Sequence, residues 1–457
     1  MLKTKAKNSS HQIDMLNGSL AKSMLVFALP LAASTILAQL FNAADVAVAG
    51  NFAGSAALAA VGANAPIVSL FVSILSGLAL GSNVIIARLV GEGNKDRIST
   101  VIHTAISLSI VCGIIMLIAG TILAEPLLLA IDTPKDVLDQ AMLYLHIYCF
   151  CLPFIMFYNF GAAILRSIGD TRRPLFILFT AGVINVGLNL IFVIVFKMGV
   201  SGVAYATLIS NIISSLMILS ILLKEEEPFR LHLNKLCFDK KALLAILKIG
   251  APAALQSALF SASNIIVQGG INTFGSAAVA GSSAGLTFEY FTYYMVNSFA
   301  QAVVTFTSQN YGAGNKKRCN RVYVLGMLEG MGITAAMSAA FILTRNYIVL
   351  FYTSDPEVIK YAVTRLLLIT AFEALTGLYE IAGGAIRGLG NSLLPALITI
   401  IGTVGFRVFW MKVIFNLYPS FDIILILYVV SWCLTGAIMI PAYFIFRKKA
   451  YSSIKLA

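Results

Sequence analysis

Charged residues are scarce in this chain. They make up 11% of its 457 residues, whereas 59% of the residues are hydrophobic. Soluble domains carry about 25% charged residues, so this composition excludes a soluble globular protein and indicates a polytopic membrane protein. We expect no cleavable signal, because residues 1–22 are polar and basic and the first apolar run is too long for one.

Motifs for several kinds of chemistry are also missing. The sequence has no Gly-Lys loop for binding phosphate, no zinc-ligand spacing and no nucleophile elbow. Its six cysteines have neither the spacing of metal ligands nor the pattern of a disulfide-bonded protein. Its four histidines form no motif. We therefore expect neither an enzyme nor an ATP-driven pump, and no cofactor.

Long apolar runs, by contrast, are abundant. A run of about 20 apolar residues is long enough to cross a bilayer as a helix. Twelve such spans are predicted, at 23–50, 56–87, 98–123, 136–164, 174–196, 201–223, 243–270, 277–308, 319–343, 357–385, 395–416 and 422–446. The predicted fold is therefore an all-α integral membrane protein with the lipid bilayer as a partner.

Lysines and arginines gather on one side of these spans. Most of the 32 lie near the chain ends or in alternate loops, with Lys3, Lys5 and Lys7 before the first span and Lys455 after the last. Cytoplasmic loops carry such an excess, so both termini are predicted to be cytoplasmic. Topology thus accounts for most of the net charge of +12. No basic patch with interleaved aromatic residues accompanies it, so we expect no nucleic-acid partner.

The chain also contains an internal repeat. Residues 91–97, Gly-Glu-Gly-Asn-Lys-Asp-Arg, recur 221 positions later as Gly-Ala-Gly-Asn-Lys-Lys-Arg at 312–318. The Arg-x-x-Gly turn that begins at Arg166 recurs with the same shift at Arg387. Because these motifs recur in the same order and at the same distance of 221 residues, the sequence indicates an internal duplication.

Each half of the repeat contains six spans, so both halves enter the membrane from the same side and form a parallel repeat. The predicted domains are an N-lobe at 1–223 (helices 1–6), a cytoplasmic connector at 224–242 and a C-lobe at 243–457 (helices 7–12). Two matched bundles suit alternating access, because one can rock against the other. A channel is less suitable, since no ring of polar residues is visible.

Pro30 and Asp45 stand out in the first span. Residues 24–50 are otherwise almost uniformly apolar, and an ionisable side chain there costs about 2.5–3.5 kcal/mol to insert, which marks Asp45 as a functional candidate. The proline removes a backbone hydrogen bond and bends the helix. Burial disfavours a charged carboxylate, so we expect Asp45 to take up a proton readily. The alternative is an aspartate that only caps or hydrogen-bonds within the lobe.

Together these residues resemble the multidrug and toxic compound extrusion (MATE) family. The resemblance covers the whole chain, through the Pro30 and Asp45 pair, both Gly-x-Gly-Asn-Lys-x-Arg loops and both Arg-x-x-Gly turns. It implies a V-shaped fold of two pseudo-symmetric six-helix lobes. It also implies export of amphipathic, often cationic compounds, coupled to inward proton or sodium movement.

The resemblance further implies a cation-coupling site in the N-lobe. Asp45 matches the family's first-helix aspartate, and Pro30 matches the proline that bends this helix. Asn185, Asn189 and Thr207 have the spacings of the family's other site residues, although Asn189 replaces a carboxylate that some members have. A single carboxylate is enough to exchange one proton or to balance one Na⁺ held by amide and hydroxyl oxygens.

Candidates for the substrate cavity lie in both halves. In the N-lobe, Gln39 and Asn42 either line the cavity or serve as polar contacts between helices. In the C-lobe, Glu289 and the nearby Tyr293 offer an acidic and aromatic wall for a cation, or only pack there.

Two further acids lie in the tenth span. Glu373 and Glu380 are two helical turns apart and are predicted to share a face, with Thr376 between them at the position where many MATE proteins place an acid. The C-lobe ion site of such members therefore does not transfer directly. The two glutamates either attract a cationic substrate or release protons, or one of them pairs with Arg407.

The sequence therefore predicts a monomeric antiporter of a bacterial inner membrane that takes a cation in and moves an amphipathic organic compound out. A proton is slightly favoured over Na⁺, because a lone carboxylate can act without a full oxygen cage. The alternative is a flippase for a lipid-linked saccharide of the same superfamily, which would be expected to bury more basic residues, whereas the embedded charges here are mainly acidic. A membrane-embedded enzyme is a weaker alternative.

Overall fold

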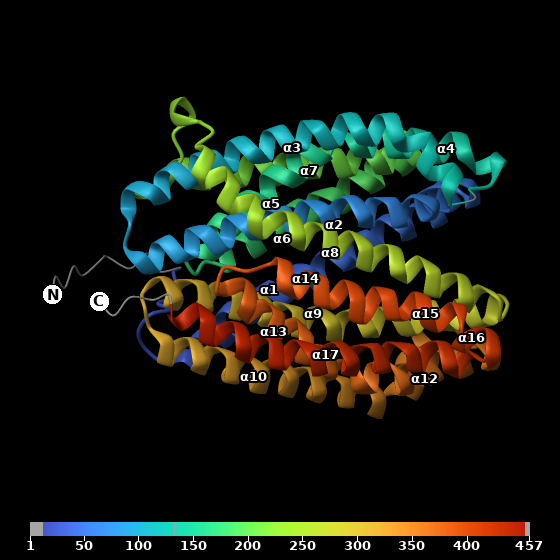
Figure 1. Ribbon diagram of the computed structural model, residues 1–457. Helices are drawn as coiled ribbons and strands as arrows, with labels where there is room; N and C mark the ends of the chain where they lie inside the picture. Colours follow the sequence, from blue (N-terminus) through green and yellow to red (C-terminus); the bar gives the residue numbers. More distant parts are fainter. Residues whose placement is uncertain (1–11, 132, 453–457) are drawn as a thin grey trace. The chain divides into compact units, whose positions relative to one another are not determined.

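The computed structural model describes residues 12–131 and 133–452, so the lysines predicted to mark the cytoplasmic ends at 3, 5, 7 and 455 lie outside it. Helices make up most of the described chain, which divides by its contacts into two units (Figure 1). Unit one holds residues 12–13 and 33–254, and unit two holds residues 14–32 and 255–452.

Unit one contains the second part of α1 (Leu20–Val48) and the first part of α8 (Lys240–Asn272). Between them lie η1 (Ala49–Ala53), α2 (Ser55–Glu92), α3 (Lys95–Ala130), α4 (Lys135–Cys149), α5 (Leu152–Ser167), α6 (Arg172–Leu190), η2 (Ile191–Val195), α7 (Val200–Lys224) and η3 (Leu233–Lys235). Helix α2 packs on α3, α4 and α5, and the buried apolar side chains of these helices form one core.

Unit two contains the remaining parts of α1 and α8 and the helices that follow. These are α9 (Ser276–Gly312), α10 (Lys316–Leu343), α11 (Arg345–Ile348), η4 (Val349–Phe351), α12 (Pro356–Leu368), η5 (Thr370–Thr376), α13 (Gly377–Gly388), α14 (Leu393–Thr399), η6 (Ile400–Gly405), α15 (Phe406–Lys412), α16 (Ile414–Leu417) and α17 (Phe421–Ser452). Helix α9 packs on α10, α12 and α13, and α13 packs on α17.

The predicted all-α membrane fold is confirmed. In the described part of the chain, nine helices are long and apolar enough to cross a membrane, and α4 with α5 gives a tenth span that is bent by 43°. The other two predicted spans are helical as well: α9 covers 277–308, and α12, η5 and α13 together cover 357–385. The structure is thus consistent with twelve spans, two of which are more polar or more broken than the rest.

The two copies of the repeated Gly-x-Gly-Asn motif form the same turn. The side chain of Asn94 accepts a hydrogen bond from the backbone N–H of Arg97 at 3.3 Å, and Asn315 does the same for Arg318 at 3.0 Å. The glycine before each asparagine has a positive φ, of 68° and 72°, which favours glycine. Helices α3 and α10 therefore begin with the same asparagine cap, as the duplication predicts.

The division by contacts differs from the predicted domains, which change within the connector 224–242. In the structure, α1 belongs to unit two as far as Ala32, and α8 belongs to unit one as far as Ala254. The connector itself packs on unit one, where Nε2 of His103 on α3 accepts a hydrogen bond from the backbone N–H of His232 at 3.0 Å. The boundary between the two units therefore lies within α1 and within α8. The composition of the sequence does not reveal such a boundary.

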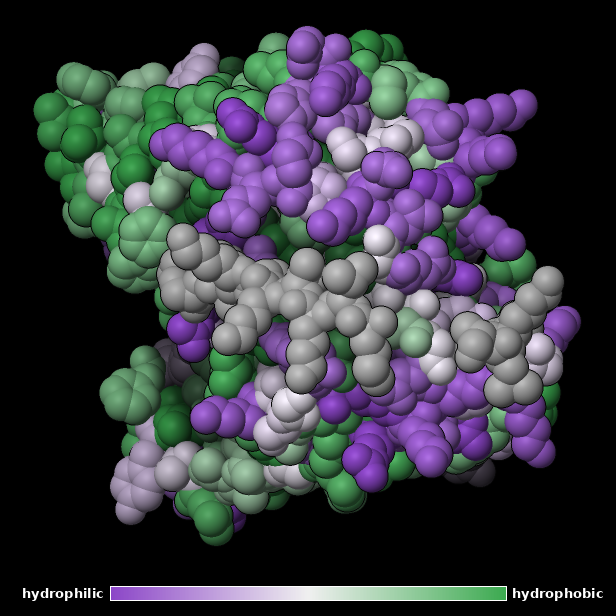
Figure 2. Space-filling model, turned by 90° about the vertical axis from the view of Figure 1, so that its left-hand side faces the viewer, coloured by the Kyte–Doolittle hydropathy of each residue, from purple (hydrophilic) through white to green (hydrophobic). Residues whose placement is uncertain are grey.

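Hydrophilic side chains gather on one end of unit one, where α2 turns into α3 and where the segment 225–239 lies (Figure 2). The helices that lead away from this end carry exposed apolar side chains, among them Ile115, Ile118 and Ile122 of α3. A polar end on an apolar helical body is the surface expected of a protein that crosses a bilayer.

The packing of α8 against α2 in unit one depends on glycines. A Cβ atom on Gly81 would lie 2.2 Å from the carbonyl oxygen of Ile246, and one on Gly250 would lie 2.7 Å from the carbonyl oxygen of Leu78. Small residues let the backbones of membrane helices approach this closely.

We expect Gly81→Ala to lower the free energy of unfolding by about 1–3 kcal/mol, because α2 and α8 must separate to admit the methyl group. Thermal unfolding in detergent measures this loss. Gly62→Ala is the matched control, since Gly62 lies on the same helix with open space around its Cβ position. An equal loss in the two variants would contradict the packing explanation.

Candidate functional site

Asp45 lies in unit one, on the part of α1 beyond Pro30, and is 7% exposed. Asn189 of α6 donates a hydrogen bond from Nδ2 to Oδ1 of Asp45, and the hydroxyl of Thr207 on α7 donates to Oδ2 at 3.4 Å. The same hydroxyl is within reach of the Val203 carbonyl at 3.0 Å, so its single proton is shared between two acceptors. Two helices thus direct donors at the carboxylate of a third.

Asn185 completes the group. It precedes Asn189 by one turn of α6, so both amides lie on the same face. Nδ2 of Asn189 is 3.3 Å from Oδ1 of Asn185, and Nδ2 of Asn185 is 3.5 Å from Oγ1 of Thr207. The structure therefore brings together Asp45 and the other three residues that the sequence predicts for the coupling site.

Two π-helical turns adjoin this group, and sequence reasoning missed both. The turn η1 begins four residues after Asp45, η2 begins two residues after Asn189, and the two turns contact each other. Turns of this kind interrupt the regular α-helical hydrogen bonds and are frequent at functional sites. No signal in the apolar sequence of either segment could have found them.

The oxygen atoms around Asp45 determine the chemistry that is open to the site. Among the described residues, no group of three or more His, Cys, Asp or Glu side chains could hold a metal ion. Oδ1 of Asn189 is buried, and it has no hydrogen-bond partner within residues 12–131 and 133–452. Such an acceptor can receive the proton of a neutral carboxyl group or contact a small cation. The site can therefore take up one positive charge.

Helix α4 contributes two tyrosines near Asp45 that sequence reasoning also missed. Tyr144 and Tyr148 are buried, their ring centroids are 6.1 Å apart, and both lie within electrostatic reach of Asp45. Their spacing of one helical turn was the signal that could have placed them on one face.

The two predicted cavity residues of α1 precede Asp45 on the same helix. Asn42 is exposed and Gln39 is half-buried. Neither is sealed inside the packing of unit one, so both remain candidates for the cavity.

In unit two, Glu289 has a partner that sequence reasoning missed. The guanidinium of Arg365 on α12 donates two hydrogen bonds to Oε2 of Glu289, at 2.7 and 2.9 Å, and a third to the hydroxyl of Ser282 at 2.7 Å. The two residues are only 2% and 8% exposed. The carboxylate is therefore already neutralised by a buried cation, and Glu289 is not a free acid beside the aromatic residues. An arginine inside a predicted apolar span was the available signal.

Glu373 and Glu380 do not lie on one unbroken helix. Glu373 belongs to the 3₁₀ helix η5 and Glu380 to the α-helix α13, which follows η5 directly, so the spacing of seven residues is not two turns of one regular α-helix. Both glutamates nevertheless lie within electrostatic reach of Tyr293. Tyr293 donates its hydroxyl to Oε1 of Glu380 at 3.4 Å, which brings two predicted cavity residues together. The hydroxyl of Thr376 is used within η5, where it donates to the Glu373 carbonyl at 2.6 Å.

Arg407 was the predicted structural partner of one of these glutamates, and this alternative is wrong. Its guanidinium donates to Oδ1 of Asn264 at 2.7 Å and lies over the rings of Tyr428 and Phe260, at 4.6 and 4.8 Å from their centroids. No carboxylate of the described residues lies within ion-pair distance of it.

The embedded charges of unit two are therefore balanced rather than mainly acidic. Arg365, Arg387 and Arg407 are buried alongside Glu289, Glu373 and Glu380. The prediction considered Arg407 but overlooked Arg365, which lies in the predicted span 357–385.

One family model, MatE, matches the chain twice, at residues 30–191 and 252–410. The chain belongs to the MatE family. The two matches begin 222 residues apart, at Pro30 and at Pro252, so they also confirm the internal duplication.

Curated proteins similar to this MatE chain match it over most of their own length. "Probable multidrug resistance protein YoeA" of Bacillus subtilis is 28% identical over 85% of this chain and 86% of the relative. "Probable multidrug resistance protein NorM" of Thermotoga maritima is 25% identical over 83% of this chain and 82% of the relative. The "FAD transporter" of Shewanella oneidensis is 26% identical over 67% and 69%.

Solved MATE structures share the fold of this MatE chain. "Crystal structure of MATE in complex with MaD3S" superposes with a TM-score of 0.87 and 22% identity, covering 97% of this chain and 99% of that one. "Outward-facing conformation of a multidrug resistance MATE family transporter of the MOP superfamily" gives 0.86 and 22%, covering 98% and 99%. At this identity the likeness concerns the fold, and it confirms the predicted MATE-type architecture.

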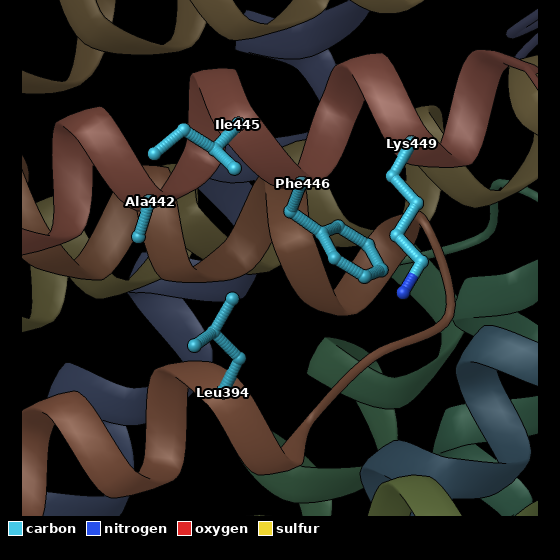
Figure 3. A pocket seen from close by; sticks show the side chains of 5 residues that line it. All are labelled: Leu394, Ala442, Ile445, Phe446 and Lys449. Carbon is cyan, nitrogen blue, oxygen red and sulfur yellow. The ribbon is translucent and has the colours of Figure 1, made fainter.

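A groove between α14 and α17 in unit two of the MatE chain has a volume of about 260 Å³. Apolar side chains of Leu394, Ala442, Ile445 and Phe446 line it, and Lys449 lies at one end (Figure 3). No predicted site residue lines this groove. Its walls offer a cation no acidic or amide oxygen, so it is not a candidate for the coupling site.

Proposed function

We propose that this MatE-family chain is a secondary antiporter that exports amphipathic, cationic organic compounds in exchange for an inward cation. The observation that carries the proposal is the buried carboxylate of Asp45, held by donors from Asn189 and Thr207 in a membrane-spanning bundle. A buried acid in an apolar helix is costly and is retained where it serves transport. The names of the bacterial multidrug resistance relatives support the substrate class.

The coupling ion that we propose is the proton. While Asp45 is charged, Asn189 and Thr207 stabilise it by donating hydrogen bonds. When Asp45 takes up a proton, it loses its charge and becomes a donor itself, and the unpartnered Oδ1 of Asn189 is an acceptor suited to it. The hydrogen bonds that hold α1 then rearrange, and the helix can bend at Pro30, where a backbone hydrogen bond is missing. Bending alters the space that is open to the substrate.

A flippase for a lipid-linked saccharide is the second candidate, and one observation favours it. Arg407 is 1% exposed and has no acidic partner at ion-pair distance among the described residues. A planar guanidinium suits the phosphate oxygens of a lipid-linked donor. The buried acid of unit one still favours the antiporter, because a flippase needs no group that changes its charge.

In proteoliposomes, we expect a pH gradient alone to drive the movement of tetraphenylphosphonium, and a Na⁺ gradient alone to have no effect, because a single carboxylate can exchange a proton without a full set of oxygen ligands. The initial rates under the two gradients measure this. The movement of a labelled lipid-linked saccharide in the same vesicles is the comparison. Movement of the saccharide without gradient-driven movement of the cation would favour the flippase.

A further inference from the structure

Helices α1 and α8 each continue from one unit into the other. The change of unit falls after Ala32 in α1 and after Ala254 in α8. In each helix a proline, Pro30 or Pro252, precedes the change by two residues. Because proline removes a backbone hydrogen bond, each helix is most easily bent close to the point where it passes between the units.

The segment that leads into α1, residues 15–18, is held inside unit two by the second copy of the repeated motif. The guanidinium of Arg318 donates hydrogen bonds to three backbone carbonyls of this segment, those of Met15 at 3.0 Å, Asn17 at 2.8 Å and Gly18 at 3.3 Å. Asn310 of α9 donates a fourth hydrogen bond to the Met15 carbonyl, at 3.1 Å. Hydrogen bonds from a charged donor are the stronger kind, so this segment is firmly attached.

The first turns of α1 are also packed into unit two. Met24 and Phe27 of α1, and Met15 in the segment before it, are at most 1% exposed. The ring of Phe27 meets that of Phe306 on α9 edge to face, with 5.6 Å between the centroids. The near end of α1 therefore belongs to the core of unit two, whereas the far end carries Asp45 into unit one.

The turn made by the motif does not require the bonds of Arg318. Arg97 occupies the matching position in the first copy, after the same asparagine cap. The Arg97 side chain is exposed, and no hydrogen bond or ion pair joins it to another residue of the described chain. Within residues 12–131 and 133–452, only the second copy, beside the segment before α1, uses its arginine to hold another segment.

We propose that Arg318 is a positioning residue of the transport cycle, which fixes the near end of α1 so that changes at Asp45 reach unit two. This inference rests on the proposed function. Asp45 lies 15 residues beyond Pro30, about 22 Å along the helix. A rearrangement at this far end can move unit two only if the near end is attached to it. Without Arg318, the segment from Met15 to Gly18 is no longer held to unit two, and the far part of α1 can move without moving unit two.

Hydrogen exchange of the full chain in lipid nanodiscs tests this transmission without any substrate. Asp45→Asn serves as the change at the far end, and the readout is the exchange of amides in residues 14–32. In the Arg97→Gln background we expect Asp45→Asn to alter this exchange by about fivefold or more. In the Arg318→Gln background the exchange is expected to be the same with and without Asp45→Asn. Arg318→Lys, which keeps the charge and part of the bonding, is expected to restore an intermediate effect.

Two results would overturn the inference: an equal response in the Arg97→Gln and Arg318→Gln backgrounds, or no response to Asp45→Asn in either. Tetraphenylphosphonium transport by the same variants adds a second readout. Arg318→Gln is expected to lower the maximal rate about tenfold while the KM stays unchanged, because the substrate and ion sites are intact. If the exchange result holds but no gradient drives wild-type transport, the proposed function fails and the positioning role stands.

Discussion

Replacing Asp45 by asparagine is expected to abolish ion-driven transport almost completely. The amide has nearly the same shape as the carboxylate, so the packing around Asn189 and Thr207 is kept. It carries no charge and exchanges no proton, so the ion loses its means of favouring one conformation over the other. A ligand without differential affinity shifts no equilibrium, and we expect the initial rate under a pH gradient to fall by about 100-fold or more. Tetraphenylphosphonium movement in proteoliposomes measures that rate.

The control for this variant is Asp96→Asn. Asp96 is an exposed acid in the first turn of α3, away from the coupling group, and its loss is expected to leave the rate unchanged. Thermal unfolding of Asp45→Asn shows whether the protein is still folded, and equilibrium binding of tetraphenylphosphonium shows whether its substrate site survives. A folded Asp45→Asn variant that transports at the full rate would remove Asp45 from the mechanism.

The coupling group could be predicted because its signals are local. Asp45 is an ionisable residue in an apolar run, and Asn185 and Asn189 have the spacing of one helical turn. The prediction that three helices contribute to this group came from the family resemblance, which added Thr207 to Asp45 and the two asparagines. The structure places these side chains in contact, whereas their role in coupling remains a prediction.

The second half was predicted less well, because its contacts are distant in sequence. Arg365 lies 76 residues after Glu289, and no local pattern links the two. The shared face of Glu373 and Glu380 assumed an unbroken α-helix, but apolar composition does not distinguish α-helix from the 3₁₀ helix η5. Side chains that pair across helices are thus visible only once the helices are packed.

The domain boundary shows the same limit. The charged residues of the connector at 224–242 indicated where the chain leaves the membrane. The predicted domain boundary was therefore based on exposure to water. The two units of the structure are defined instead by which residues pack against one another. The start of α8 belongs to unit one because glycines such as Gly81 and Gly250 allow α2 and α8 to touch. Glycine alone does not reveal which helix will approach it.

The buried pair of Glu289 and Arg365 is the second place where a large effect is expected. In Glu289→Gln the guanidinium of Arg365 remains 2% exposed and loses its counter-charge. Removing one partner of a buried ion pair costs about 3–5 kcal/mol, because the remaining charge is left uncompensated away from water. We therefore expect a large loss of thermal stability in detergent. Glu329→Gln is the control, since Glu329 lies on α10 and forms no ion pair in the described chain.

Replacing both partners tests whether the uncompensated charge causes this loss. The double variant Glu289→Leu with Arg365→Met removes both charges and keeps apolar volume at the site. Well-packed apolar pairs replace buried ion pairs at little cost, so the double variant is expected to be more stable than either single variant. If the two losses simply added, the stability would come from the separate packing of each side chain rather than from their pairing. Recovery in the double variant would instead show that Glu289 is retained to balance Arg365, so that Glu289 is not an acid whose charge changes during transport.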